Sequence, residues 1–251
     1  MMNTASSIRV WQGFMNQEYR SKQSEFYDLL GSVFMPVTSQ VMQPMGMQAY
    51  FPGILPYTGQ SFPDEVALVV YESQENYYQA SRETVIGRAY GKLHGDVFNF
   101  QGSANDPASW STFPEKYTGQ PIQEEQCYFF TGAELDWSAL SMQCLCFSIY
   151  GLEGDGSMDS VESPFVKLCQ SLISKEEIKE VIISIGKTYL LVWVCIGVEA
   201  GSKELVSSVF SSDDLKFHLV SKPHEVSPIW TVYDPGLSVS PGQLLSLSLK
   251  K

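Results

Sequence analysis

The stretch 84–98, TVIGRAYGKLHGDVF, combines an arginine, a tyrosine, an aspartate and one of the three histidines of the chain. His94 is two residues from Asp96, and such a pair could accept a proton in a cofactor-free proton transfer. Arg88 could bind a carboxylate or enolate oxygen, because its guanidinium is a planar and permanently charged donor. With Tyr90 one helical turn before the histidine, the stretch predicts a catalytic group made of these four side chains.

The same residues also fit a purely structural helix. Small residues recur along one helical face, which lets a helix lie close to a sheet; they are Ala80, Thr84, Gly87 and Gly91. Gly91 and Gly95 could instead leave room for a ligand, and Gly95 also suits a helix C-terminal cap. His94 near that end could simply bond the last carbonyls, and the helix dipole would favour its charged form. Arg88 is expected on a different side of the helix from His94.

The histidines do not form a metal-binding pattern. His94, His218 and His224 are not spaced as HxxxH or HxH, so a zinc site is not expected. The sequence contains no GxSxG, GxxxxGKS or strand-linked GxGxxG motif, which leaves hydrolase, P-loop and dinucleotide functions without support. We therefore expect neither a metal nor a cofactor. Haem binding through one histidine is an open alternative, which visible absorption of the protein would reveal.

The composition is that of an acidic globular protein. The chain has 251 residues, 44% of them hydrophobic, and a formal net charge of −12. Neither half is basic, which argues against nucleic acid and anionic membranes as partners. The longest apolar run, 188–198, is too short to cross a membrane, and the N-terminus has no export signal. A cytoplasmic protein is expected, with its five cysteines as buried thiols.

Strands and helices alternate along the first half of the chain. The first helix is expected to begin after Asn16, which can cap it, and to end near Pro36. The second helix is expected to begin after the cap Ser73 and to contain no break. A polar loop is expected at 101–120, after the second helix. The predicted order is strand 8–15, helix to about 36, strand within 45–56, strand 64–73, helix 74–93 and strand 127–132.

The second half repeats this order of elements. A helix is expected at 163–173, with Ser163 as its cap and Pro164 in its first position. Gly186 marks the turn of a hairpin within 178–198. The full set of predictions is strand 142–151, helix 163–173, the hairpin, helix 202–210, and strands 215–221, 229–235 and 244–250.

Each half thus contains strand, helix, strand, strand, helix and strand. This is the order of a ferredoxin-like module, a four-stranded antiparallel sheet with helices on one face. An α+β fold is expected, with tandem βαββαβ modules at 1–135 and 136–251, sheets packed together and helices outside. The pattern resembles the dimeric α+β-barrel superfamily, in which two such units, from two chains or one duplicated chain, enclose a central cleft.

The resemblance implies a range of activities. Proteins of this superfamily serve as cofactor-free monooxygenases, polyketide cyclases, isomerases, haem enzymes and ligand-binding modules, and the fold does not choose among them. We expect an enzyme that acts without metal on a small apolar or aromatic carbonyl compound, by acid/base chemistry or cofactor-free oxygenation. Trp11 and Tyr71 are expected to line its cleft. The alternative is a non-catalytic module for ligand binding or protein interaction, and a homo-oligomer is compatible with either.

Overall fold

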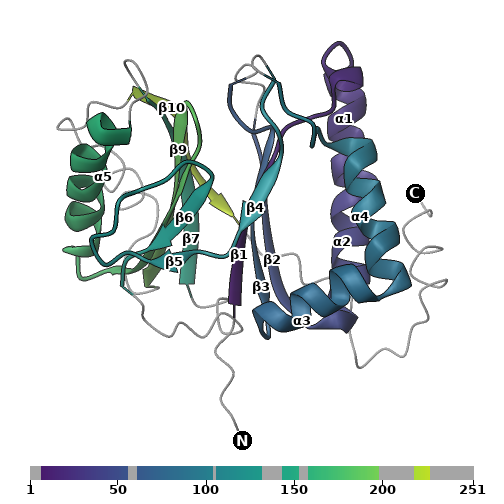
Figure 1. Ribbon diagram of the computed structural model, residues 1–251, viewed down its shortest axis with the longest axis horizontal. Helices are drawn as coiled ribbons and strands as arrows, with labels where there is room; N and C mark the ends of the chain where they lie inside the picture. The colour runs from purple at the N-terminus through teal and green to yellow at the C-terminus, as the bar shows by residue number, and fades with distance from the viewer. Residues whose placement is uncertain are drawn as a thin grey trace, which may run out of the picture.

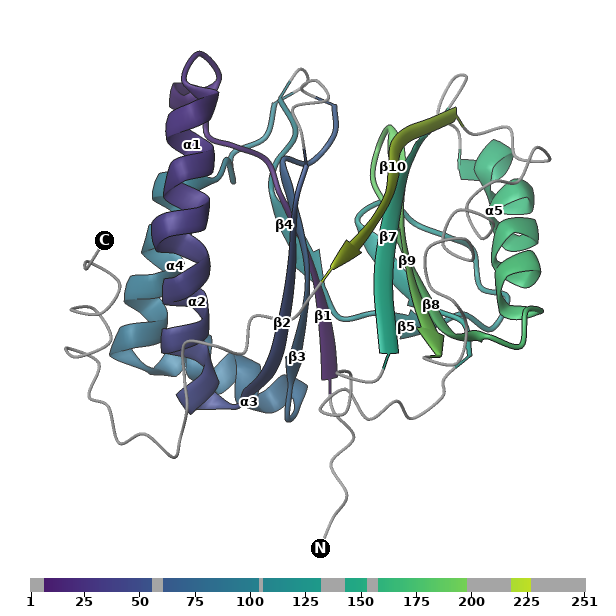
Figure 2. The same ribbon diagram turned by 180° about the vertical axis from the view of Figure 1, so that it is seen from behind.

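Two β-sheets face each other across the centre of this α+β protein (Figure 1). The computed structural model describes residues 7–55, 61–103, 106–131, 143–152, 158–197 and 218–226. Helices cover the outer face of each sheet, and Figure 2 shows the same layers from behind. The layers therefore run helix, sheet, sheet, helix, with the two sheets in the middle.

The first sheet is built from the first half of the chain. Its strands are β1 (Ser7–Gly13), β2 (Met47–Ile54), β3 (Glu65–Tyr71) and β4 (Trp110–Thr112). They lie in the order β2-β3-β1-β4, and each neighbouring pair is antiparallel. Every residue of β3 is buried, as expected for an inner strand that is covered on both faces.

Two helical segments cover the outer face of this sheet. The first consists of α1 (Gln23–Leu29), the π-helical η2 (Leu30–Phe34) and α2 (Met35–Met42), flanked by the 3-10 turns η1 (Gln17–Tyr19) and η3 (Gln43–Met45). The second consists of α3 (Gln74–Tyr78), the π-helical η4 (Gln79–Glu83) and α4 (Val85–Val97). Both pack on the sheet through an apolar cluster that includes Trp11, Phe34, Tyr50 and Phe98.

The second sheet contains six strands and is covered by α5 (Met158–Ile173). Its strands are β5 (Glu115–Lys116), β6 (Gln126–Phe129), β7 (Gln143–Gly151), β8 (Ile178–Ile185), β9 (Tyr189–Gly197) and β10 (His218–Val226). They lie in the order β10-β7-β9-β8-β6-β5, and only β5 and β6 pair in parallel within the described strands. The order β10-β7-β9-β8 matches β4-β1-β3-β2 of the first sheet.

The two inner sheet faces meet in a continuous apolar cluster. Large side chains from both sheets pack there, including Phe51 and Leu68 from the first sheet and Phe147 and Trp193 from the second. Each of these four residues is at most 1% exposed. The expected packing of sheet on sheet is thus confirmed. The central cleft expected from the resemblance is not found among the described residues, because these side chains fill the space.

The boundaries of both helices in the first half differ from those expected. The first helix does not end near Pro36 but continues to Met42, because Pro36 falls in the first turn after the π-helical segment, where a proline is tolerated. The second is interrupted at Thr84, whose backbone is extended (φ −89°, ψ 149°). The Thr84 hydroxyl accepts a hydrogen bond from the Gly87 N–H (2.9 Å), so Thr84 caps α4. Gly95 is not a cap, since α4 continues to Val97.

Two elements near the middle of the chain also differ from expectation. The strand expected at 127–132 is β6, which pairs with β8 in the second sheet, and β4 is the last strand of the first sheet. α5 begins before the expected cap Ser163, so Pro164 lies inside the helix. Packing of the following turns on the second sheet outweighs the restriction that proline imposes. The expected helix at 202–210 and strands at 229–235 and 244–250 lie outside the described residues.

Other expectations for the second half are confirmed. The hairpin turns at Gly186, whose N–H donates to the Tyr189 carbonyl (2.9 Å). The described cysteine side chains are buried, as expected; they are Cys127, Cys146, Cys169 and Cys195. Among the described helices, none combines the length and the apolar character that a bilayer crossing requires.

Candidate functional site

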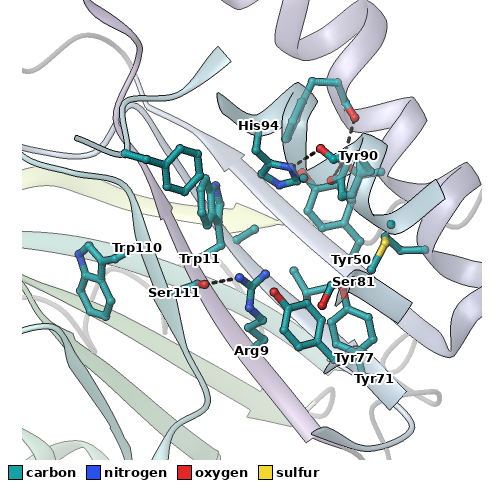
Figure 3. Close-up of a pocket in the computed structure, with 18 residues that line it drawn as sticks. Arg9, Trp11, Tyr50, Tyr71, Tyr77, Ser81, Tyr90, His94, Trp110 and Ser111 are labelled. Atoms are coloured by element: carbon teal, nitrogen blue, oxygen red, sulfur yellow. Dashed lines mark hydrogen bonds between the residues drawn. The ribbon is translucent and has the colours of Figure 1, made fainter. Parts of the chain in front are cut away.

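A cavity of about 440 Å³ lies between the first sheet and its helices. Residues of β1, β2 and β3 line it on one side, and residues of α2, α3 and α4 line it on the other (Figure 3). A volume of this size is typical of sites for small organic molecules. The candidate site therefore lies on the outer face of the first sheet, opposite the face on which a cleft was expected.

Small residues keep this space open. Ala67 on β3 contributes only a methyl group to the lining, and α4 contributes Gly87 and Gly91. A Cβ at Gly87 would overlap the carbonyl group of Ala80, so the close approach of η4 and α4 requires this glycine. A Cβ at Gly91 would meet no atom within 4 Å. The small residues of this helix thus serve packing at Gly87 and leave open space at Gly91.

Arg9 brings a positive charge to the cavity. Its Cζ lies 4.3 Å from the centroid of the Tyr77 ring, and its Nη2 donates a hydrogen bond to the Ser111 hydroxyl (Figure 3). Stacking on an aromatic face orients the guanidinium and leaves most of its N–H donors for other partners. Within the described residues Arg9 forms no ion pair. Its charge is therefore available to an anionic or carbonyl oxygen in the cavity.

His94 reaches the cavity from α4 and is enclosed by aromatic rings. The ring centroids of Tyr90, Phe34 and Trp11 lie 4.3, 4.8 and 5.5 Å from that of the imidazole. Its Nδ1 is 2.9 Å from the backbone carbonyl oxygen of Tyr90. Because a carbonyl only accepts, Nδ1 carries the proton, and Nε2 keeps its lone pair. Nε2 makes no hydrogen bond to any residue that the structure describes.

The imidazole of His94 is neutral at physiological pH. Burial lowers its pKa to about 4, and the hydrogen bond to the Tyr90 carbonyl offsets only part of this effect. The nearby positive charge of Arg9 lowers the pKa further. The expectation that the helix dipole favours the charged form is therefore wrong, because desolvation outweighs the dipole. The ring can accept a proton or a hydrogen bond at Nε2.

Hydroxyl groups provide further polar atoms in the wall. The Thr38 hydroxyl donates to the Phe34 carbonyl oxygen (2.8 Å), so the hydrogen bond between Thr38 and Tyr90 is donated by the phenol. Burial raises the pKa of Tyr90 and also that of Tyr71, which lines the same cavity. Both phenols therefore keep their protons at physiological pH.

Glu65, at the start of β3, is a buried carboxyl beneath the cavity lining. It is 0% exposed, and it accepts hydrogen bonds from Trp11 Nε1 (3.0 Å) and from the Tyr50 hydroxyl (2.9 Å). Both donors belong to side chains that line the cavity. Burial raises the pKa of Glu65 to about 7, against the lowering effect of these two hydrogen bonds. Its charge therefore changes close to neutral pH.

The structure brings only some of the expected site residues together. His94 and Tyr90 line the cavity, and so do Trp11 and Tyr71. Arg88 is exposed, and its Nη1 donates to the carbonyl oxygens of residues 82 and 83 at the end of η4 (3.2 and 3.0 Å). Asp96 is also exposed, lies outside the lining and has no hydrogen bond or ion pair in the described structure.

Two residues of this region, Arg9 and Glu65, are not among those expected from the sequence. Arg9 interrupts the apolar strand IRVWQGFM and shares the face of Trp11 by the alternation of a strand. Glu65 opens the apolar run EVALVVY in the same way. A charged residue on the buried face of a strand was the available signal, since such residues need a polar partner or a function.

The described residues do not form a metal centre. They contain no cluster of three or more His, Cys, Asp or Glu side chains that could hold a metal ion. The histidines are also spread over the fold, with His94 on α4 and His218 and His224 on β10 of the other sheet.

Comparisons with known proteins give only distant similarities. The chain matches no family model and no curated protein. A "putative monooxygenase" from Fusobacterium nucleatum superposes with a TM-score of 0.38 at 6% identity, covering 90% of this chain and 94% of the other. A "putative monooxygenase" from Lactobacillus acidophilus superposes with a TM-score of 0.35 at 6% identity, covering 89% of this chain and 94% of the other. An anthrone oxidase-like protein superposes with a TM-score of 0.41 at 6% identity, covering 90% of this chain and 91% of the other. These values are too low to support a family or a function.

Proposed function

We propose that this protein is a metal-free enzyme for small molecules, with its active site in the cavity between the first sheet and its helices. One observation carries the proposal: the same cavity is lined by an arginine and a neutral histidine, and in the described part of the chain the arginine has no ion pair and the histidine Nε2 no hydrogen bond. The substrate that fits this pair is an apolar or aromatic carbonyl compound with an acidic C–H group beside the carbonyl.

The reaction begins with proton transfer to His94. Nε2 accepts the proton from the carbon next to the carbonyl, and the electrons of the broken C–H bond move to the carbonyl oxygen. Arg9 stabilises the resulting enolate oxygen through its guanidinium. A pKa of about 4 makes His94 a weak base in the empty cavity, but an enolate beside it favours the charged imidazolium. This enolate is common to the cyclase, isomerase and cofactor-free oxygenase reactions.

The remaining lining residues hold the substrate and the base. The Tyr90 carbonyl fixes the tautomer of His94, and the aromatic rings of Trp11 and Tyr71 provide flat apolar surface. We assign the role of binding the oxyanion to Arg9 instead of Arg88, whose guanidinium bonds backbone carbonyls. We assign no role to Asp96 in the proton transfer.

A non-catalytic ligand-binding module is the second candidate. The low pKa of His94 favours it, because a histidine that stays neutral is a good hydrogen-bond acceptor and a poor base. The same cavity would then hold a ligand with a hydroxyl group at Nε2 and an oxygen at Arg9. The two candidates share the site and differ only in whether a proton moves.

Deuterium exchange at carbon tests the enzyme proposal. The bicyclic ketone 2-tetralone is incubated with the protein in D2O, and loss of its α-proton signals is followed by NMR. The proposal predicts exchange faster than in buffer, with a loss of about 10²- to 10⁴-fold in His94→Ala and of about 100-fold in Arg9→Met. Lys92→Ala, an exposed position on the same helix, serves as the matched control and keeps the wild-type rate.

The outcomes separate the two candidates. Binding of the ketone without exchange above the buffer rate would favour the binding module. Exchange that is lost in Asp96→Ala as well as in His94→Ala would restore the pair expected from the sequence. Native mass spectrometry and an absorption spectrum of the freshly purified protein would add the identity of any bound molecule, including haem.

The architecture that accompanies this proposal is a tandem pair of ferredoxin-like modules. The shared strand order β4-β1-β3-β2 and β10-β7-β9-β8 supports it. The division into 1–135 and 136–251 is part of the proposal, although β5 and β6 precede residue 135 and lie in the second sheet. A cytoplasmic location and a small apolar partner are the accompanying expectations.

A further inference from the structure

Glu65 joins two of the side chains that shape the cavity. Its Oε2 accepts from Trp11 Nε1 on β1, and its Oε1 accepts from the Tyr50 hydroxyl on β2. The carboxyl thus ties three adjacent strands together through side chains. Trp11 and Tyr50 are 5% and 2% exposed, so water does not readily replace these bonds.

Among the residues that the structure describes, no cation forms an ion pair with the Glu65 carboxyl. Burial is the largest influence on its pKa. A carboxylate buried without a countercharge is costly, so a purely structural bridge between Trp11 and Tyr50 would be served as well by a neutral glutamine. The charge of Glu65 therefore calls for an explanation beyond the two hydrogen bonds.

We infer that Glu65 is a specificity-determining residue of the cavity: it positions Trp11 and Tyr50, and its charge selects against anionic ligands. This inference rests on the proposed function, since it takes the cavity as a ligand site. An ionised Glu65 repels an anion bound at Arg9, whereas a protonated Glu65 does not. A neutral carbonyl compound is accepted in both states and is therefore preferred at and above neutral pH.

Of the described groups that line the cavity or bond to its lining, Glu65 is the one whose pKa lies in the middle of the range from pH 6 to pH 8. The pKa of His94 is about 4, and burial raises the pKa of the nearby phenols above their usual range. Asp64, the preceding residue, has a pKa raised to about 6 by burial, but it is bonded by the Met15 N–H and Arg20. The charged and titratable groups of the lining are Arg9 on β1, Tyr50 on β2, Tyr71 on β3, Tyr77 on α3, and Tyr90 and His94 on α4.

Two fluorescent dyes with the same rings test the inference. 8-Anilinonaphthalene-1-sulfonate is an anion, and N-phenyl-1-naphthylamine lacks the sulfonate and is neutral. For the wild type we expect the anion to bind about tenfold more weakly at pH 8 than at pH 6, as one buried charge acting across the cavity predicts. The affinity for the neutral dye should stay within twofold. In Glu65→Gln the affinity for the anion should no longer depend on pH in this range.

Tyr50→Phe provides a second variant with a different prediction. It keeps the carboxyl but removes one donor that favours the ionised form, so the pH midpoint for the anionic dye should move upward. Gly91→Phe, which places a ring where a Cβ meets no atom, should displace both dyes and so locate them in the cavity. Circular dichroism checks that each variant is folded.

The results distinguish the inference from the proposal on which it rests. If both dyes bind in the cavity and the anion keeps its pH dependence in Glu65→Gln, the inference is overturned while the ligand site stands. If neither dye binds the wild type, or Gly91→Phe binds both as well as the wild type does, the cavity is not the ligand site and both ideas fail.

Discussion

β3 and β9 occupy the same position in their sheets, yet they present different side chains to the helices. Toward the outer layer β3 turns Glu65, Ala67, Val69 and Tyr71, whereas β9 turns Leu190, Val192, Val194 and Ile196. The aliphatic side chains of β9 pack against α5 and leave a dense core. The smaller and more polar set on β3 borders the cavity. Side-chain size and polarity, rather than strand order, thus explain why the cavity lies beside β3.

The difference has a physical cost in the first half. Its outer layer buries a carboxyl and an imidazole, and it leaves space that apolar side chains could fill. Each of these features lowers stability relative to a dense apolar core. Such costs in stability are typical of binding sites.

The largest effect is expected on the rate of α-proton exchange. His94→Ala should lower the exchange of the 2-tetralone α-protons by 10²- to 10⁴-fold, because it removes the proton acceptor. The matched truncation in the second half, Leu190→Ala, lies far from the cavity lining and should leave the rate per folded molecule within about twofold. Proton NMR in D2O measures both rates. Equal losses in the two variants would contradict the assignment of chemistry to the first half.

The next effect concerns stability and pH. The pKa of Glu65 is raised from 4.5 to about 7 on folding, so between these values the folded protein holds a proton that the unfolded chain has released. The free energy of unfolding should therefore fall as pH rises from 4.5 to 7, and stay level above 7. The free energy of unfolding of Glu65→Gln, measured relative to that of the wild type, should therefore rise by about 3 kcal/mol between pH 4 and pH 8. Urea unfolding at several pH values measures this difference, and a constant difference would show that folding does not raise the pKa of Glu65.

A matched valine truncation compares the packing of the two outer faces. Val192→Ala removes two methyl groups from a dense core and should cost about 2 to 3 kcal/mol. Val69→Ala enlarges a space that already exists and should cost about 1 kcal/mol, since little new cavity surface forms. Denaturant unfolding of both variants gives the comparison. A larger loss for Val69→Ala would mean that the first half is the denser one.

The smallest effect is expected at Gly91. Gly91→Ala should raise the free energy of unfolding by about 0.5 to 1 kcal/mol, because alanine favours the helix and its Cβ meets no atom. Gly87→Ala is the opposing control, since its Cβ would overlap the Ala80 carbonyl and should lower the melting temperature. Thermal unfolding separates the two, and stabilisation by both would contradict the close approach of η4 and α4.

Much of the fold could be predicted from the sequence, because local signals agreed with the final packing. Ser73 caps α3 as expected, and Asn16 caps the first helical turn. The order of elements from β1 to α4 and the hairpin at Gly186 followed from alternation and turn residues, whereas β4 lies in the stretch expected as a loop. The break at Thr84 could not be foreseen, since it depends on the contact of Gly87 with the Ala80 carbonyl across the two helices.

The site was harder to predict, because it depends on which sheet face is filled. His94, Tyr90, Trp11 and Tyr71 were identified from residue type and meet in the cavity. Their position on the outer face follows from the volumes of side chains on several strands and helices, which no local pattern encodes. The sequence alone favours Arg88, which is close to His94 along the chain. Only the fold shows that Arg9 on β1 lines the same cavity as His94.

The protonation state of His94 tests most directly the central claim that Nε2 of this histidine accepts a proton from a ligand in the cavity. The chain contains three histidines, so nitrogen-15 NMR of the imidazoles can be assigned with a single His94→Gln variant. We predict that His94 stays neutral down to about pH 4, carries its proton on Nδ1, and shows a shift of Nε2 when 2-tetralone is added. A titration near pH 6.5, a proton on Nε2, or no response to the ketone would contradict the account.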